Sequence, residues 1–217
     1  MRMQYKHIFG WCLVLLPCLS HAQYAKEDWK DRDQWMDVPK LLEWAEVGRG
    51  DIVADIGCHE GYLTFHLSEV VGNYGVVYAV DVNETPLRAL RTHLKEEKVE
   101  NVQVVLGDYD DPKLPENLLN HIFIIDAYHE MVSYQDILTH CFKALKPGGK
   151  LIILEKLKFE HRNKDRAGQT AAHTLASSFV REELETSGFQ VVHYEKDFGP
   201  WERNPEKVMW VLIAQRD

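Results

Sequence analysis

Two apolar runs, each ending in an acid, constrain the fold of this chain more than any other feature of its sequence. Residues 51–61 read DIVADIGCHEG, in which the run ends at Asp55 and a turn follows between Gly57 and Gly61. Residues 62–71 have a helical pattern, and residues 75–81 form the second run, which ends at Asp81. A strand, a glycine loop, a helix and a second strand in this order are typical of the nucleotide-binding half of a doubly wound sheet.

The acids of this segment indicate what kind of ligand it binds. A loop that binds a dinucleotide presents backbone N–H groups and a helix N-terminus to a pyrophosphate. Here Asp55 precedes the loop and Glu60 lies at the start of the helix, so both carboxylates would repel a phosphate. A ligand with an amine, a cationic centre and a ribose, but no phosphate, suits these charges, and S-adenosylmethionine is such a ligand.

The rest of the sequence continues the alternation of strands and helices. Strands are expected over 52–56, 76–81, 102–106, 121–126 and 150–155. Helices are expected over 84–97, between the fourth strand and residue 145, and before the turn at residues 187–188. Such alternation requires a parallel sheet with right-handed crossovers. Residues 189–196 and 207–214 are joined without a helix, so these two strands must be antiparallel. We therefore expect an α/β fold, a doubly wound, mostly parallel, seven-stranded sheet with an antiparallel C-terminal edge hairpin.

Over roughly residues 35–217, this arrangement resembles the Rossmann-like fold of the class I S-adenosylmethionine-dependent methyltransferases. Five family motifs occur in register, at residues 55–61, 81, 107–109, 126–129 and 145–154. One position departs from the family pattern, because His59 stands where many members have a second loop glycine. The resemblance implies S-adenosylmethionine as the cofactor and methyl transfer as the reaction.

The resemblance also implies which residues hold the cofactor. Asp81 would accept hydrogen bonds from both ribose hydroxyls, and Asp108 would lie beside the adenine. His59 would narrow the amino-acid end of the pocket. The expected cofactor-binding residues are Asp55, Gly57, His59, Glu60, Gly61, Asp81, Val82, Asp108, Tyr109 and Asp126.

The loop after the fourth strand carries the catalytic hypothesis, because a ligand of a doubly wound sheet lies where the strand order reverses. His129 in this loop would be the general base that takes the proton of the acceptor. Two other roles for His129 stay open, as a wall of the substrate pocket or as a helix-start residue bonded to a backbone carbonyl. Tyr128, Trp35 and His173 are the expected substrate contacts. No metal is expected, because His129, His173 and His193 have no recognisable ligand spacing.

The N-terminus has the three-part pattern of a secretory signal peptide. Arg2 and Lys6 precede an apolar run over 8–19, and residues 20–22 form a cleavage site of the small-x-small type. The run is short for a bilayer span, although an uncleaved membrane anchor is the alternative. We expect residues 1–22 to be a signal peptide, 23–50 an N-terminal helical cap segment and 51–217 the methyltransferase domain.

Charge and cysteine content limit the partners. The chain has a formal net charge of −9, and removal of Arg2 and Lys6 with the signal peptide makes this −11. A strongly acidic domain is a poor nucleic-acid binder, so no nucleic-acid partner is expected. Only Cys58 and Cys141 remain after cleavage, which excludes a disulfide framework.

Together these features predict an exported S-adenosylmethionine-dependent methyltransferase, periplasmic or secreted, without stable membrane insertion after cleavage. Its acceptor would be a small molecule that the sequence does not name, and its oligomeric state is left open. One alternative is an NAD-type Rossmann oxidoreductase, which Asp55, Glu60 and the terminal hairpin disfavour. The other is a non-catalytic exported binding module, which is suggested by export itself because S-adenosylmethionine is made inside the cell.

Overall fold

The computed structural model describes residues 25–217, so the expected signal peptide lies outside the described residues. Helices and strands alternate in the order predicted from the sequence. The helices are α1 (Trp29–Arg32), α2 (Val38–Ala45), α3 (Tyr62–Val71), α4 (Glu84–Glu97), α5 (Tyr134–Ala144), α6 (Arg166–Thr170) and α7 (Ser177–Thr186). The strands are β1 (Ile52–Ile56), β2 (Val76–Asp81), β3 (Val102–Leu106), β4 (Leu119–Ile125), β5 (Leu145–Lys158), β6 (Gln190–Pro200) and β7 (Lys207–Gln215).

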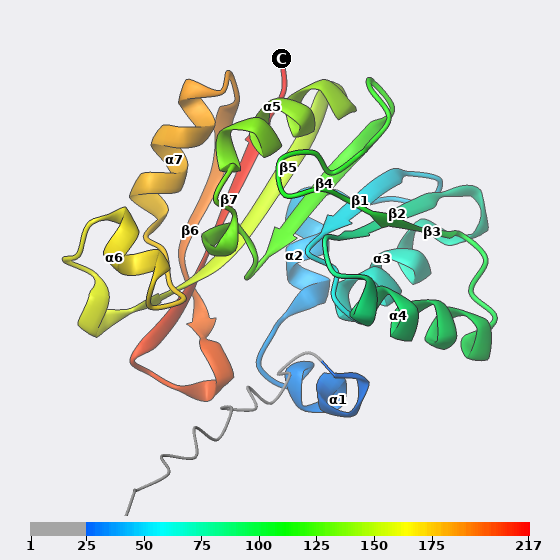
Figure 1. Ribbon diagram of the computed structural model, residues 1–217, viewed down its shortest axis with the longest axis horizontal. Helices are drawn as coiled ribbons and strands as arrows, with labels where there is room; N and C mark the ends of the chain where they lie inside the picture. Colours follow the sequence, from blue (N-terminus) through cyan, green and yellow to red (C-terminus); the bar gives the residue numbers. More distant parts are fainter. Residues whose placement is uncertain (1–24) are drawn as a thin grey trace, which may run out of the picture.

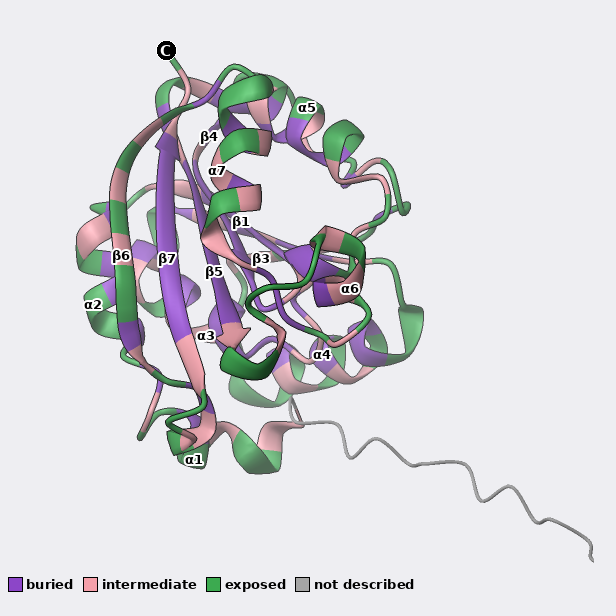
Figure 2. Ribbon diagram, turned by 90° about the vertical axis from the view of Figure 1, so that its left-hand side faces the viewer, coloured by how far each residue is buried: buried purple, intermediate pink, exposed green. Residues whose placement is uncertain are grey.

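All of these strands belong to one seven-stranded sheet with the order β3-β2-β1-β4-β5-β7-β6 (Figure 1). The neighbours from β3 to β5 are parallel, whereas β7 runs antiparallel to both β5 and β6. The predicted doubly wound, mostly parallel sheet with an antiparallel C-terminal hairpin is therefore confirmed. The last strand of the chain lies inside the sheet and β6 forms its edge, so β7 is largely buried while β6 carries many exposed residues (Figure 2).

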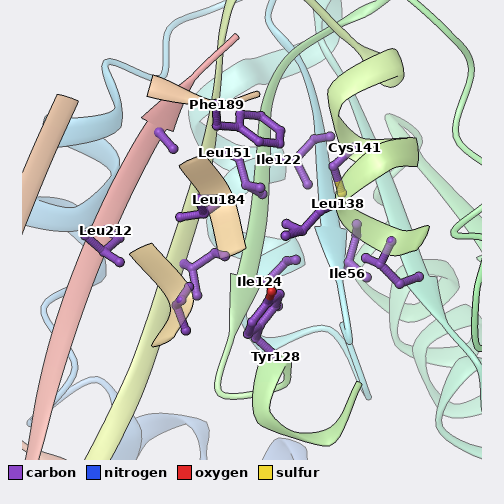
Figure 3. Close-up of a cluster of buried hydrophobic side chains, with 14 of the residues drawn as sticks. Ile56, Ile122, Ile124, Tyr128, Leu138, Cys141, Leu151, Leu184, Phe189 and Leu212 are labelled. Carbon is purple, nitrogen blue, oxygen red and sulfur yellow. The ribbon is translucent and has the colours of Figure 1, made fainter. Parts of the chain in front are cut away.

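Helices cover both faces of this sheet, because successive strand residues point to opposite sides. On one face, Ile122 and Ile124 of β4 belong to the same buried cluster as Leu138 of α5 and Leu184 of α7 (Figure 3). On the other face, Phe123 of β4 shares a cluster with side chains of α2 and α3. Helix α4 packs through its leucines against the same side, beside β2. The result is a three-layer sandwich with the sheet between two layers of helices.

Strand β5 is longer than the sequence predicted. It runs past residue 155 because β7 pairs with it as far as Lys158. This pairing extends the sheet over residues 156–158, beyond the strand predicted for 150–155. Lys156 is consequently buried, with a side chain only 7% exposed, and forms an ion pair with Asp126. The extension is a tertiary effect, since the long partner strand lies fifty residues further along the chain.

The N-terminal segment packs against the end of the sheet where a ligand would bind. Trp35, between α1 and α2, lies edge-on against Trp201, which follows β6, with ring centroids 4.7 Å apart. Helix α2 begins at an N-cap, Asp37, whose side chain accepts a hydrogen bond from the backbone N–H of Lys40. Within residues 25–217, no helix is both long enough and apolar enough to cross a membrane.

Candidate active site

Two adjoining cavities lie at the carboxyl ends of β1, β2 and β4, where the strand order reverses between β1 and β4. The larger has a volume of about 350 Å³ and the smaller about 180 Å³. Both are lined by Gly57, Asp81, Val82, Tyr109 and Glu130, so they form one continuous groove over the ends of the strands. This is the place where ligands of open α/β sheets bind.

The glycine loop owes its shape to two residues that admit no side chain. Gly57 has φ +79°, and an added Cβ would lie 2.6 Å from the Cβ of Ala127. Gly61 has φ +100°, and its Cβ would lie 2.5 Å from Cδ1 of Leu90. Gly57 therefore lets the loops after β1 and β4 approach each other at the groove. Gly61 does not line the groove, and instead lets α3 start close against α4.

Asp81, the last residue of β2, presents its carboxylate to both cavities. Its Oδ2 accepts a hydrogen bond from the backbone N–H of His59 at 3.0 Å, and its Oδ1 accepts one from the backbone N–H of Asn83 at 2.9 Å. Each oxygen keeps acceptor capacity for one further donor. A pair of vicinal ribose hydroxyls matches this arrangement. His59 is thereby held beside Asp81 in the lining of the larger cavity, and its place at the amino-acid end of a bound cofactor stays a prediction.

The opposite end of the larger cavity carries a negative and a positive charge. Asp55 is buried and accepts a hydrogen bond from the hydroxyl of Thr64 at 2.6 Å. Burial raises the pKa of Asp55 to about 6, and the nearby Arg32 opposes this rise. Arg32 itself comes from α1 and stacks on Tyr62, with Cζ 4.3 Å from the ring centroid. A carboxylate and a guanidinium side by side complement a ligand end that has both an ammonium and a carboxylate.

Arg32 is a functional candidate that the sequence did not reveal. It lies in a polar segment without periodicity, more than twenty residues before the glycine loop. The structure brings it to the groove because α1 folds over the start of α3. With Asp81 at one end and Asp55 and Arg32 at the other, the groove fits the ribose and the amino-acid part of S-adenosylmethionine.

The loop after β4 is held by buried charges. Asp126 has φ +53°, lines the larger cavity and pairs with Lys156. His129 is almost completely buried, and its Nδ1 lies 3.0 and 2.9 Å from the two carboxylate oxygens of Glu155. Glu155 also accepts a hydrogen bond from the backbone N–H of His129. Burial lowers the pKa of His129, but the charge and hydrogen bond of Glu155 oppose this effect, and the net shift of the pKa is upward. His129 does not line the groove, but Glu130 does.

Some of the residues expected at the site lie elsewhere. The carboxylate of Glu60 turns away from the groove and accepts the backbone N–H of Lys26. Tyr128 is fully buried and donates its hydroxyl hydrogen to Glu183 of α7 at 2.8 Å, so it belongs to the core. Trp35 packs on Trp201 and does not line either cavity.

Three further residues are at or near the groove. Asp108 lines the smaller cavity, where Lys113 pairs with its carboxylate at 3.0 Å. Tyr109 lines both cavities and is 78% exposed, so its ring is free to cover a ligand. His173 lies beside Glu130, with 3.5 Å between its Nδ1 and Oε1 of Glu130.

Known proteins resemble this chain over the segment that carries the groove. Residues 53–149 match the model of a family described as "Methyltransferase domain". The ubiquinone/menaquinone biosynthesis C-methyltransferase UbiE of Azotobacter vinelandii is 34% identical over 115 residues, which are 52% of this chain and 46% of that protein. The demethylmenaquinone methyltransferase of a Geobacillus species is 28% identical over 121 residues, with 52% of each chain covered. The chain thus spans about half the length of these curated relatives.

Solved structures share the whole architecture. A SAM-dependent methyltransferase from Aquifex aeolicus superposes with a TM-score of 0.72 at 23% identity, covering 88% of this chain and 98% of that one. Phosphoethanolamine N-methyltransferase 2 of Haemonchus contortus, solved with S-adenosyl-L-methionine, has a TM-score of 0.69 at 15% identity and covers 91% and 59%. Residues 53–149 thus match a methyltransferase domain, and the fold of the chain is that of the S-adenosylmethionine-dependent methyltransferases.

Proposed function

We propose that this protein transfers the methyl group of S-adenosylmethionine to a small-molecule acceptor. The observation that carries the proposal is the charge layout of the groove, with the Asp81 carboxylate at one end and Asp55 beside Arg32 at the other. This layout suits a neutral ribose and a zwitterionic amino acid, and it disfavours the pyrophosphate of a nicotinamide cofactor.

The residues of the groove have separate tasks in this reaction. When bound, S-adenosylmethionine supplies an electrophilic methyl group. Asp81 would hold the ribose, while Asp55 and Arg32 would fix the ammonium and the carboxylate of the amino-acid part. Tyr109, which is exposed beside both cavities, would exclude water from one side. An in-line displacement at carbon depends mainly on such alignment and desolvation of the reactants.

The expected role of His129 as a general base receives no direct support from its position. Its side chain is only 2% exposed, and Glu130 stands between it and the groove at 3.7 Å from its Nε2. Because Glu155 raises the pKa of His129, the imidazole holds its proton more firmly than a free one does. Methyl transfer therefore depends on alignment of the reactants, and His129 holds the loop after β4 in place.

Calorimetry with S-adenosylmethionine, S-adenosylhomocysteine and NAD⁺ tests the cofactor part of this proposal. Wild type should bind the first two, and Asp81→Ala should weaken that binding by roughly 10- to 100-fold because two charge-assisted hydrogen bonds are lost. Glu84→Gln, on the exposed start of α4, is the matched control and should bind like wild type. Preferential binding of NAD⁺ would favour an oxidoreductase instead.

Formation of S-adenosylhomocysteine across a panel of acceptors tests the transfer itself. Quinone precursors belong at the head of the panel, because the relatives described above are named as quinone methyltransferases. Turnover that depends on the acceptor supports the proposal. Tight cofactor binding without turnover on any acceptor class would instead favour a non-catalytic binding module.

We further infer that the protein works outside the cytoplasm after residues 1–22 are removed. The inference rests on the basic start, the apolar run and the cleavage pattern of the sequence. N-terminal sequencing of the protein from its native cell should find Gln23 first. Soluble cytoplasmic protein that begins at Met1 would contradict export, and membrane-bound protein that begins at Met1 would favour an uncleaved anchor.

A further inference from the structure

Three side chains that the sequence does not connect come together at the edge of the groove. They are His129 and Glu130, in the turn after β4, and His173, which follows α6. Nε2 of His129 lies 3.7 Å from Oε1 of Glu130, and Nδ1 of His173 lies 3.5 Å from the same oxygen. One ligand atom from each residue lies within 4.8 Å of the other two. These separations are too long for good hydrogen bonds, so the three groups face one another without being hydrogen-bonded to each other.

Two of the three separations between ligand atoms match what a metal ion needs, and the third, between His129 and His173, is within 4.8 Å. In a tetrahedral site with metal–ligand distances near 2.0–2.2 Å, the ligand atoms lie about 3.3–3.6 Å apart. Both distances to Oε1 of Glu130 are within about 0.2 Å of that range. The two imidazole rings are edge-on, 5.7 Å apart at an angle of 89°, so their nitrogen atoms can point to one place without the rings colliding.

Glu155 orients the imidazole ring of His129 as a metal ligand would need to be oriented. Its Nδ1 is bonded to a carboxylate that is completely buried, so the Nδ1 hydrogen is directed at Glu155 and Nε2 faces Glu130. A metal-binding histidine almost always donates its other ring N–H to such a carboxylate, which fixes the ring and its tautomer. Glu155 therefore has the place of the supporting residue behind a metal ligand.

His173 is also held in position, although its side chain is exposed. The next residue, Thr174, is fully buried and donates its hydroxyl hydrogen to the carbonyl of Lys156 at 2.8 Å, and it accepts the backbone N–H of Lys158 at 2.9 Å. These two bonds attach the segment to β5, the strand that carries Glu155. His173 itself has φ +51°. This left-handed conformation costs energy in a non-glycine residue, and it sets the direction in which the side chain leaves the backbone.

A neighbouring set of acids is a weaker candidate. Asp126, His129 and Glu155 also lie close enough to hold an ion. However, the ammonium group of Lys156 already neutralises Asp126, and both oxygens of Glu155 are occupied by His129. The exposed pair, Glu130 and His173, leaves a path from solvent that the buried set lacks.

We propose that His129, Glu130 and His173 bind one divalent transition-metal ion, best matched by Zn²⁺, at the wall of the cofactor groove. Two imidazoles and one carboxylate suit zinc and similar first-row ions, whereas magnesium and calcium prefer sites built from oxygen alone. Three protein ligands leave at least one position for water or for an oxygen of an acceptor. Because Glu130 lines both cavities, the ion lies next to the place where the acceptor must enter. The sequence expectation of no metal is thereby revised.

Zinc binding is measured on the untagged full chain, first stripped with a chelator, by calorimetry with Zn²⁺ and by the visible absorption of Co²⁺. Wild type should bind one ion per chain, and Mg²⁺ should not compete. His173→Ala should weaken binding by at least about 100-fold, since even residues behind the ligands contribute about 10- to 100-fold. The matched control is His140→Ala, because His140 is a partly exposed histidine of α5 next to an acid, and this variant should bind like wild type.

Glu155→Gln separates a built site from a chance group of side chains. It keeps all three ligands but loses the carboxylate behind His129, so zinc affinity should fall by about 10- to 100-fold while the stoichiometry stays at one. Absence of stoichiometric binding by wild type would overturn the proposal. So would equal affinities of His173→Ala and His140→Ala. These measurements use neither cofactor nor acceptor, so their outcome is independent of the proposed methyl transfer.

Discussion

Nδ1 of His129 and the carboxylate of Glu155 face each other at 3.0 and 2.9 Å, with both side chains almost completely removed from solvent. The pair joins the loop after β4 to the neighbouring strand β5. One residue further along β5, Lys156 pairs with Asp126 of the same loop. Two buried pairs of side chains thus fix the loop that carries one wall of the groove.

Glu155→Gln is expected to destabilise the protein. The variant removes the negative charge that faces a buried imidazole, and loss of one partner of a buried pair typically costs about 3–5 kcal/mol. The free energy of unfolding from urea titrations gives the measurement. Glu160→Gln is the comparison, because Glu160 is 76% exposed and its pair with His161 should contribute less than about 1 kcal/mol. Equal stabilities of the two variants would mean that the His129–Glu155 pair does not fix the loop.

Asp55→Asn is expected to change how stability depends on pH. The carboxyl of Asp55 titrates near pH 3.8 when unfolded and near about 6 when folded, because burial penalises its charge. Between these values the folded protein binds more protons than the unfolded one, so stability falls as the pH rises from about 4 to 6. The asparagine cannot ionise, and its amide oxygen can still accept from Thr64. The variant should gain about 2–3 kcal/mol over wild type between pH 4 and pH 7.

Unfolding measured at several pH values between 4 and 7.5 tests this prediction. A constant difference between wild type and Asp55→Asn at every pH would contradict it. The same variant should bind S-adenosylmethionine more weakly at pH 7, because it lacks the charge that would pair with the ammonium group. Stability and cofactor affinity should therefore change in opposite directions.

Gly57→Ala is expected to distort the groove, because it adds a side chain where the loops after β1 and β4 meet. The added methyl group would lie 2.6 Å from Cβ of Ala127, and a φ of +79° is unfavourable for alanine. A loss of about 1–3 kcal/mol in stability and a weaker affinity for S-adenosylmethionine should result. Gly48→Ala is the matched control, since Gly48 lacks a positive φ and the nearest atom to its Cβ would be 3.7 Å away. Its stability and affinity should remain close to those of wild type.

Local patterns in the sequence were sufficient for most of the fold. The bounds of β1, β2, β3 and α4 agree with the predicted ones, because each is a clear apolar run or a regular helical stripe between turn residues. The acid at the end of β2 was found for the same reason, since a strand end can be located from the strand. The extra length of β5 was missed because it depends on pairing with a distant strand.

The sequence did not reveal those parts of the site whose residues are far apart along the chain. Arg32 reaches the groove only because α1 folds back over α3, and Glu155 meets His129 across 26 residues. The orientation of Tyr128 was also not predictable, because a residue after a strand can point to the groove or to the core. In this protein the ring enters the core and reaches Glu183. Side-chain direction in irregular segments is set by packing that no short pattern encodes.

Arg32→Met is expected to distinguish binding of the amino-acid part of the cofactor from binding of its nucleoside. The methionine keeps much of the apolar packing on Tyr62 but loses the guanidinium that would bind a carboxylate. Affinity for S-adenosylmethionine should fall by roughly 10- to 100-fold, as expected for the loss of a charge-assisted hydrogen bond. Affinity for 5′-methylthioadenosine, which has the nucleoside but not the amino acid, should stay near the wild-type value.

Asp81→Ala provides the opposite pattern for comparison. Because its carboxylate faces the ribose position, this variant should lose affinity for both ligands by a similar factor. Calorimetry of the two ligands with wild type and both variants gives the complete set of comparisons. If Arg32→Met weakened both ligands equally, Arg32 would act by shaping the groove as a whole. Selective loss of S-adenosylmethionine would place the amino-acid end of the cofactor between α1 and the end of β1.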